Sequence, residues 1–172
     1  TDLDVLVRAR AAMQNALMDA WSARTENLPL TEPYEALILA SIVEKETGVA
    51  SERPEIAGVF TRRLALRMRL QTDPTVIYGL GAEFDGNLTR RHLRDDNNQF
   101  NTYRIAGLPP TPIALPGKEA IVASLNPKDG EALYLVAKVD GSHAFSRTLS
   151  EHEENVRRYQ LKRRKDYRSS PK

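Results

Sequence analysis

The first clear pattern along the chain is a helical repeat of apolar residues near its start. Between Asp2 and Ser22, apolar residues recur at steps of three and four with charged residues between them, namely Leu3, Leu6, Val7, Ala11, Leu17, Met18 and Trp21. This spacing predicts an amphipathic helix over residues 2–22.

A second apolar segment has a different character. Residues 36–43 read ALILASIV, in which only Ser41 is polar. Pro33 suits a first helical turn and Gly48 suits a stop, so we predict a helix over residues 33–48. Because this helix is apolar on every face, it should lie in the centre of a domain.

Beyond residue 48 the apolar repeats are shorter, and turn-forming residues separate them. We first predict a helix capped by Ser51, a short helix over residues 71–79, and a polar loop over 85–102 with one helical turn at 90–93. A proline-rich extended segment over 108–116 and a helix over 118–125 should follow. The chain should continue with a β-hairpin over 133–146 and a last helix, for which Ser150 and Glu153 have capping-box spacing.

These elements predict a mainly helical α+β fold with a small β-hairpin. We interpret residues 1–172 as a single domain. It would comprise an opening helix over 1–22, a core over 33–148 and a basic C-terminal helix over about 150–166.

Composition narrows the classes of function. The chain has 172 residues and is 41% hydrophobic, and its 25 Lys and Arg nearly balance its 23 Asp and Glu. A net charge of +2 does not indicate a nucleic-acid partner. The absence of cysteine excludes disulfides and thiolate metal sites. There is no bilayer-length apolar run and no signal peptide, and because the first residue is Thr1 we read the sequence as part of a longer protein.

The most informative single residue is Glu44, at the end of the apolar helix. Removal from water and the negative end of the helix dipole would both disfavour its charged form. A Glu that keeps its proton near neutral pH is suited to general acid catalysis. Two alternatives stay open: Glu44 may be a solvated last-turn residue, as Lys45 would suggest, and the pattern does not separate Glu44 from Glu46.

The three histidines offer no metal site. His92, His143 and His152 are separated by 51 and 9 residues, which matches no zinc-binding spacing, so we predict no metal and no other cofactor. We interpret His143 as a structural or groove-edge residue. The basic residues after Val156 favour a solvated helix face over attraction to an anionic wall or membrane surface.

Several motifs resemble those of the endolytic murein transglycosylases, the MltG or YceG-like family. They occur in the order seen in that family and cover residues 37–156: ASIVEKET (40–47), SER (51–53), MRLQTDPTVIYG (68–79), FNTY (100–103), GLPP (107–110), PG (116–117), HAFS (143–146) and EH (151–152). Arg62, Phe100 and Thr111 depart from residues common at their positions in that family.

The resemblance implies a lysozyme-like fold and a catalytic role for Glu44, the first Glu of IVEKE. It implies cleavage of the β-1,4 bond between N-acetylmuramic acid and N-acetylglucosamine without water, in which Glu44 acts first as acid and then as base and the product is a 1,6-anhydro end. Supporting residues would hydrogen-bond or stack on the glycan, and the candidates are Gln71, Thr72, Asp73, Asn101 and Tyr103. Two alternatives stay open for these residues: Thr72 and Asp73 as caps of a helix, and Asn101 as a residue that only shapes a turn.

The same resemblance gives expectations about the setting of the protein. The partner would be peptidoglycan, together with peptidoglycan synthases, and a membrane-anchored parent protein would lie at the periplasmic face of the bacterial inner membrane. Two other functions stay open. A lysozyme-type hydrolase would need a second carboxylate such as Asp73 facing Glu44, and a non-catalytic glycan-binding module would need Glu44 to be misplaced.

Overall fold

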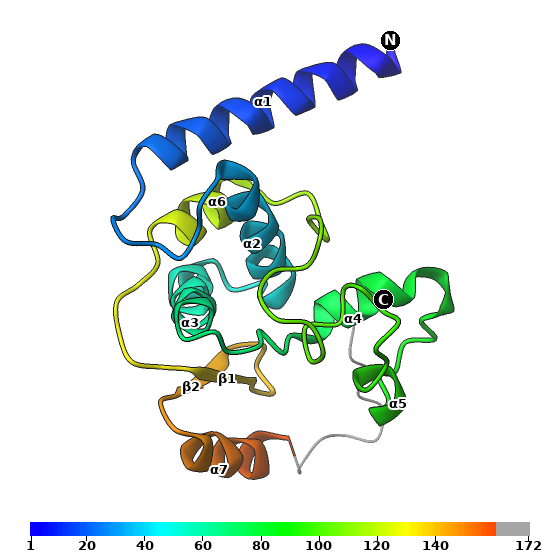
Figure 1. Cartoon of the computed structure of the whole chain (residues 1–172), viewed down its shortest axis with the longest axis vertical. Coiled ribbons are helices and arrows are strands. Elements are labelled where there is room, and N and C mark those ends of the chain that lie inside the picture. Colours follow the sequence, from blue (N-terminus) through cyan, green and yellow to red (C-terminus); the bar gives the residue numbers. More distant parts are fainter. Residues whose placement is uncertain (161–172) are drawn as a thin grey trace.

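The computed structural model describes residues 1–160. Its elements are the α-helices α1 (Asp2–Ser22), α2 (Pro33–Glu46), α3 (Arg53–Ala65), α4 (Asp73–Leu80), α5 (Arg90–Leu93), α6 (Lys118–Leu125) and α7 (Leu149–Tyr159), the 3₁₀ turns η1 (Ala50–Glu52) and η2 (Gly81–Glu83), and the strands β1 (Tyr134–Ala137) and β2 (His143–Ser146). The fold is therefore mainly helical with one two-stranded antiparallel sheet, as the sequence predicts (Figure 1).

Helix α2 lies at the centre of the molecule, as predicted from its apolar sequence. Its residues from Ile38 to Val43 are all buried, and it contacts α1, α3, α4 and α6. Ser41, the polar exception, donates to the carbonyl oxygen of Ile38 and accepts a hydrogen bond from the backbone N–H of Ile113. The helix ends at Glu46, two residues before Gly48, because the backbone is already extended at Thr47.

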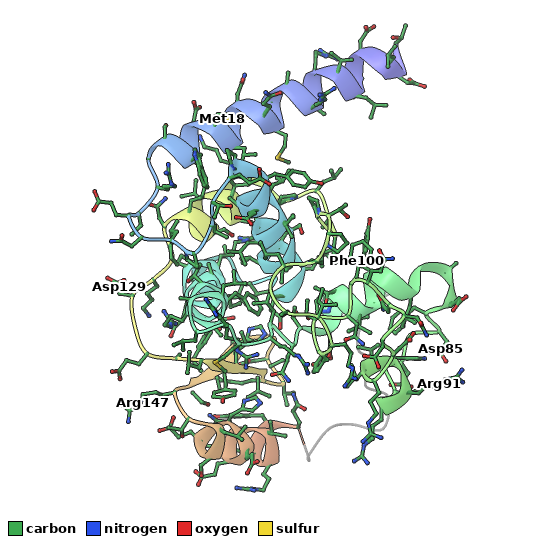
Figure 2. All side chains as sticks on the ribbon, in the orientation of Figure 1. Met18, Asp85, Arg91, Phe100, Asp129 and Arg147 are labelled. Atoms are coloured by element: carbon green, nitrogen blue, oxygen red, sulfur yellow. The ribbon has the colours of Figure 1, made fainter. Side chains whose placement is uncertain are left out.

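Helix α1 has the predicted bounds but packs along only half of its length. Leu17 and Ala20 are buried against the core, whereas Leu3 and Leu6 are 67% and 66% exposed. The N-terminal half extends beyond the rest of the molecule, and its side chains project into open space (Figures 1 and 2). The apolar stripe of α1 therefore extends beyond the core, and its N-terminal residues are not covered by other parts of the described chain.

The starts and ends of two helices differ from the sequence-based prediction. Ser51 does not cap α3; it lies in the 3₁₀ turn η1, and the helix begins at Arg53. Helix α4 runs past Gly79 to Leu80 and stops at Gly81, which has a positive φ of 55°. Gly79 serves a packing role instead, because a Cβ there would lie 1.9 Å from the amide oxygen of Asn98.

Asn98 helps to order the long polar loop that contains α5. Its side-chain amide donates to the carbonyl oxygen of Val76 in α4, and its oxygen accepts from the backbone N–H of Phe100. The one helical turn predicted in this loop is α5. Figure 1 shows the loop beside α4, on the side of the molecule away from the β-hairpin.

The β-hairpin and α7 complete the described part of the chain. The hairpin pairs Tyr134 with Ser146 and Ala137 with His143. Helix α7 lies beneath it in Figure 1. The predicted cap at Ser150 and Glu153 is wrong: the capping box is formed two residues earlier by Thr148 and Glu151. Both pairs have the same spacing, and Thr148 is the one with extended backbone after the strand. Residues 161–166 of the predicted basic helix lie outside the described residues.

Candidate functional site

A groove of about 570 Å³ lies between the end of α2, helix α3, the segment leading into α4, the hairpin and α7. Its polar and titratable side chains come from segments far apart in the sequence. They include Lys45, Glu46, Arg63, Gln71, Thr72, Asp73, Tyr103, Tyr134, His143, His152 and Gln160. Four of the five predicted substrate-binding residues therefore lie along one groove.

Two carboxyl groups line this groove, Glu46 and Asp73, and Glu46 is the last residue of α2. The Thr72 hydroxyl donates to its Oε2 at 2.5 Å. Burial raises the pKa of Glu46, and the nearby charge of Asp73 raises it further. The Thr72 hydrogen bond and the electrostatic effects of nearby His143 and Arg63 oppose this rise without reversing it. Glu46 therefore keeps its proton to a higher pH than a free Glu does.

Glu44 lies outside the groove. Successive helical residues are rotated by about 100°, so side chains two residues apart point about 200° apart around the axis of α2. The Glu44 Oε2 accepts from the backbone N–H of Gly117 at 3.1 Å, and its Oε1 lies 3.6 Å from a guanidinium nitrogen of Arg53. The side chain of Glu44 is 28% exposed, and both of these partners lie outside the groove.

The segment from Gln71 to Asp73 forms one wall of the groove. Gln71 has a left-handed backbone with φ of 53°, which is uncommon for a residue other than glycine and is typically retained at functional sites. Its side-chain oxygen accepts from Arg63 at 3.3 Å. Thr72 occupies the N-cap position of α4, but its hydroxyl donates to Glu46 and makes no cap hydrogen bond. The capping alternative for Thr72 is thus wrong.

Tyr103 joins this wall through Asp73. Its phenol donates to the Asp73 Oδ1 at 2.7 Å. Burial raises the pKa of the Tyr103 phenol, with Asp73 adding to the rise, so the phenol stays protonated. The pair places the Asp73 carboxylate, which accepts this hydrogen bond, near the half-buried carboxyl of Glu46.

Asn101 is the one predicted binding residue that the structure does not bring into the groove. Its side chain is fully buried. The amide donates to the carbonyl oxygens of His92, Leu93 and Asp95 at 3.2, 3.3 and 2.9 Å, and its oxygen accepts from the backbone N–H of Tyr103. These bonds fit the alternative that Asn101 shapes the loop, and they leave no polar atom for a glycan.

Arg63 is a groove residue that the sequence interpretation missed. Its guanidinium donates to the carbonyl oxygens of Leu133 and Leu70, at 2.6 and 2.8 Å, and lies 5.0 Å from the ring centroid of Tyr134. A signal was available, because Arg63 continues the apolar stripe of α3 one turn after Val59 and Phe60. A charged residue in a core-facing position is rarely buried without partners.

His143 stands at the opposite side of the groove, at the start of β2. Its Nδ1 lies 2.8 Å from the Glu52 Oε2, and its backbone N–H donates to the Glu52 Oε1 at 2.9 Å. Glu52 is the second residue missed from the sequence. Its role depends on a contact between residues 91 positions apart, which no local pattern reveals.

Comparison with known proteins places this arrangement in a family. The sequence model of the YceG-like family matches residues 1–158. This chain belongs to the YceG-like family. Its relatives include proteins named endolytic murein transglycosylase in Bacillus subtilis (strain 168), with 33% identity over 92% of this chain, and in Streptococcus pneumoniae serotype 2 (strain D39), with 33% identity over 85%.

The family resemblance extends to a solved structure. The crystal structure of a yceG-like protein from Listeria monocytogenes matches with a TM-score of 0.66 and 42% identity, over 72% of this chain and 40% of that chain. The chain spans less than half of each relative, namely 43% of the Bacillus protein and 27% of the Streptococcus protein.

Two other features of this YceG-like chain bear on its function. A second hollow of about 680 Å³ lies beside α5 and is lined by Leu80, Glu83, Arg91, His92, Arg94, Asp95 and Asn97, none of which is a predicted site residue. Figure 2 shows Arg91 pointing outward from α5.

Within residues 1–160, no three His, Asp or Glu side chains cluster as metal ligands, and no helix is long and apolar enough to cross a membrane.

Proposed function

We propose that this chain is the catalytic part of an endolytic lytic transglycosylase that cleaves peptidoglycan strands. The observation that carries the proposal is a half-buried carboxyl, Glu46, whose pKa is raised by loss of water, in a groove lined by hydrogen-bonding side chains. The names of the Bacillus and Streptococcus relatives support the same reaction class.

Within this proposal the acid is Glu46. Protonation of a glycosidic oxygen needs a carboxyl that holds its proton near neutral pH and faces the substrate. Glu46 lines the groove and its pKa is raised, which favours the protonated form, whereas Glu44 is held outside the groove by Gly117 and Arg53. The assignment expected from the family resemblance thus moves by two residues along the same helix.

The bond proposed to break is the β-1,4 link between N-acetylmuramic acid and N-acetylglucosamine. Glu46 gives its proton to the leaving oxygen, and the C6 hydroxyl of the muramic acid attacks its own C1 and forms a 1,6-anhydro ring. A well-oriented intramolecular nucleophile reaches effective molarities of about 10⁵ M or more, so no bound water is needed. The Glu46 carboxylate left by the first step is one acceptor for the C6 proton.

The groove wall suits a neutral glycan. Gln71 and Thr72 offer amide and hydroxyl groups to N-acetyl and hydroxyl groups of the sugar. Tyr103 and Tyr134 add aromatic surface against which sugar rings can lie. The groove is formed by surface segments on several sides, so binding within a strand is sterically compatible with the endolytic action that we propose.

A lysozyme-type hydrolase is the second candidate, and Asp73 is the observation that favours it. Asp73 lines the same groove and is close enough to Glu46 to raise its pKa. Inverting and retaining hydrolases both use a second carboxylate, which activates water or attacks C1 itself. A non-catalytic binding module has less support, because it would not need a half-buried carboxyl in the groove.

The test is a digestion of purified peptidoglycan in ¹⁸O-labelled water, followed by mass spectrometry of the fragments. The proposed reaction gives unlabelled 1,6-anhydro-N-acetylmuramic acid ends at several fragment lengths from the start. Labelled reducing ends as the main product would reject the transglycosylase and favour a hydrolase that uses Asp73. Intact strands with retained binding would favour the binding module.

We further propose a lysozyme-like arrangement of the fold around Glu46, in which a buried helix ends in the acid. Association with peptidoglycan synthases, a membrane-anchored parent protein and a periplasmic position at the inner membrane remain predictions from the family resemblance. A pull-down of the purified protein with synthases, and fractionation of cells that produce the parent protein, would test them.

A further inference from the structure

A second titratable side chain in the groove is positioned by a partner of its own. The side chain of His143 is 4% exposed. Its Nδ1 lies 2.8 Å from one carboxylate oxygen of Glu52, and its backbone N–H donates to the other oxygen at 2.9 Å. The Thr47 hydroxyl lies 3.4 Å from the same carboxylate. Three groups therefore converge on Glu52, and together they fix the plane and rotation of the imidazole ring.

This contact determines which ring nitrogen carries the hydrogen. A carboxylate accepts hydrogen bonds, so the hydrogen of the neutral ring resides on Nδ1 and the lone pair resides on Nε2. His143 lines the groove and Glu52 does not, so the edge of the ring that carries Nε2 is the one turned toward the groove. Among residues 1–160, Nε2 has no hydrogen-bond partner.

Other titratable side chains of the groove are less suited than His143 to accept a proton, because they are held in other contacts or carry a proton already. Arg63 is a cation that donates hydrogen bonds to backbone carbonyls, and the Tyr103 phenol donates a hydrogen bond to Asp73. His152 stacks on Tyr134 at 5.2 Å, and burial lowers its pKa. Glu46 is the acid with a raised pKa. An acid and a base with environments that differ in this way commonly mark the two proton-transfer groups of an active site.

We propose that His143, oriented by Glu52, is the base that accepts the C6 hydroxyl proton during ring closure. This proposal rests on the transglycosylase function proposed above. Glu46 donates its proton to the glycosidic oxygen as the C1–oxygen bond breaks. The C6 oxygen forms its bond to C1 and releases its proton to Nε2. The imidazolium then returns that proton to the Glu46 carboxylate, so that no water or proton is consumed.

The division of roles has a chemical advantage over a single carboxyl. Bond breaking and ring closure place a proton on one oxygen while removing a proton from another, and two separate groups can do both in one transition state. Glu52 is then a positioning residue, because it touches His143 and not the sugar. It favours the tautomer that accepts a proton and stabilises the imidazolium that forms.

The test uses chemical rescue, which a purely structural histidine does not show. We expect His143→Ala to lower kcat by about 10²–10⁴-fold with little change in KM, because general base catalysis typically contributes that much. Added imidazole should restore at least part of kcat, and the products should remain 1,6-anhydro ends. Imidazole should not rescue Glu46→Gln, which is the matched control. Glu52→Gln should lower kcat less than His143→Ala does.

The outcomes separate this proposal from the function on which it rests. A folded His143→Ala with kcat close to that of the wild type, or with a loss that imidazole leaves unchanged, overturns the role of His143 and leaves the transglycosylase intact. Labelled reducing ends from the wild type reject the transglycosylase itself. If His143→Ala does not fold, His143→Gln replaces it: Gln keeps most of the volume but cannot carry a proton, so an unchanged kcat overturns the proposal.

Discussion

The two carboxylates at the end of α2 show how differently one helix terminus can be used. Glu46 faces the groove, is bonded to Thr72 and has a raised pKa. Glu44, two residues earlier, contacts the backbone N–H of Gly117 and the guanidinium of Arg53 in the next helix. Both follow the same apolar run, so the run alone does not decide which one becomes an acid. The segments that return to each side of the helix decide it.

The difference extends to the neighbours of each carboxylate. On the side of Glu46, Gln71, Asp73 and the nearly buried His143 line a groove. On the side of Glu44, Arg53 also bonds Glu119, at 3.3 Å, so its charge is shared between two carboxylates of the protein itself. The first side is arranged to bind another molecule, and the second is arranged to hold α2, α3 and α6 together.

The largest expected effect comes from substituting each carboxylate separately. Glu46→Gln should lower kcat by about 10²–10⁴-fold, because the acid that protonates the leaving oxygen is lost. Glu44→Gln is the matched control, since it has the same chemistry and lies on the same helix. It should stay within about threefold of the wild type, because surface substitutions seldom move the site. Release of soluble fragments from peptidoglycan measures both.

The opposite ranking would return the catalytic role to Glu44, as the family resemblance implies, and would make the groove around Glu46 a binding feature. Equal losses in both variants, with circular dichroism unchanged, would mean that both carboxylates act in the reaction. Each outcome therefore changes the comparison between the two sides of α2.

The next effect concerns Asn101, whose role is structural in this geometry. Asn101→Ala removes three donated hydrogen bonds and leaves the carbonyl oxygens of His92, Leu93 and Asp95 without this partner. We expect a loss of about 3 kcal/mol or more in the free energy of unfolding, since each unsatisfied buried group costs about 1–3 kcal/mol. Urea denaturation measures the loss.

Asn101→Asp is the companion variant, because a carboxylate keeps the size but cannot donate these hydrogen bonds. It should destabilise the chain at least as much as Asn101→Ala. If either variant keeps its full stability but loses affinity for glycan, Asn101 is a binding residue as first predicted from the sequence.

The sequence predicts local features of this fold well. The bounds of α1, α5 and α6 follow from periodicity and caps, and the central position of α2 follows from its apolar faces. Errors occur where two local signals compete. Ser150 and Glu153 have the same spacing as Thr148 and Glu151, and only the strand before Thr148 decides between them.

The candidate site is predicted less completely, for a different reason. Gln71, Thr72, Asp73 and Tyr103 were found through a family resemblance and do line the groove. Arg63 and Glu52 were missed because their functions depend on residues 70 and 91 positions away. The choice between Glu44 and Glu46 depends on Gly117 and Thr72, which reach α2 from distant loops.

A smaller effect links Glu46 to stability. Its folded-state pKa is raised, so the folded chain binds a proton more tightly than the unfolded chain. Stability is therefore lost as the pH rises from the unfolded value, near 4.5, through the raised folded value. Glu46→Gln removes this penalty. We expect its Tm to exceed that of the wild type at pH 7 and to match it near pH 4, which thermal denaturation at the two pH values measures.

The smallest effect is expected from the other carboxylate. Glu44→Gln removes the charge that Arg53 faces at 3.6 Å, but Gln can still accept the hydrogen bond from the Gly117 N–H. Partly exposed ion pairs contribute about 0.2–1 kcal/mol, so the loss in the free energy of unfolding should fall in that range. It should shrink further in 1 M salt, where the screening length is about 3 Å. Parallel urea denaturation of the wild type and Glu44→Gln at low and high salt measures both.

A loss above about 2 kcal/mol that persists in 1 M salt would show that Glu44 is held in a desolvated site, because buried charges are screened much less than exposed ones. In that case the contrast between the two carboxylates would be one of accessibility to substrate and no longer one of burial.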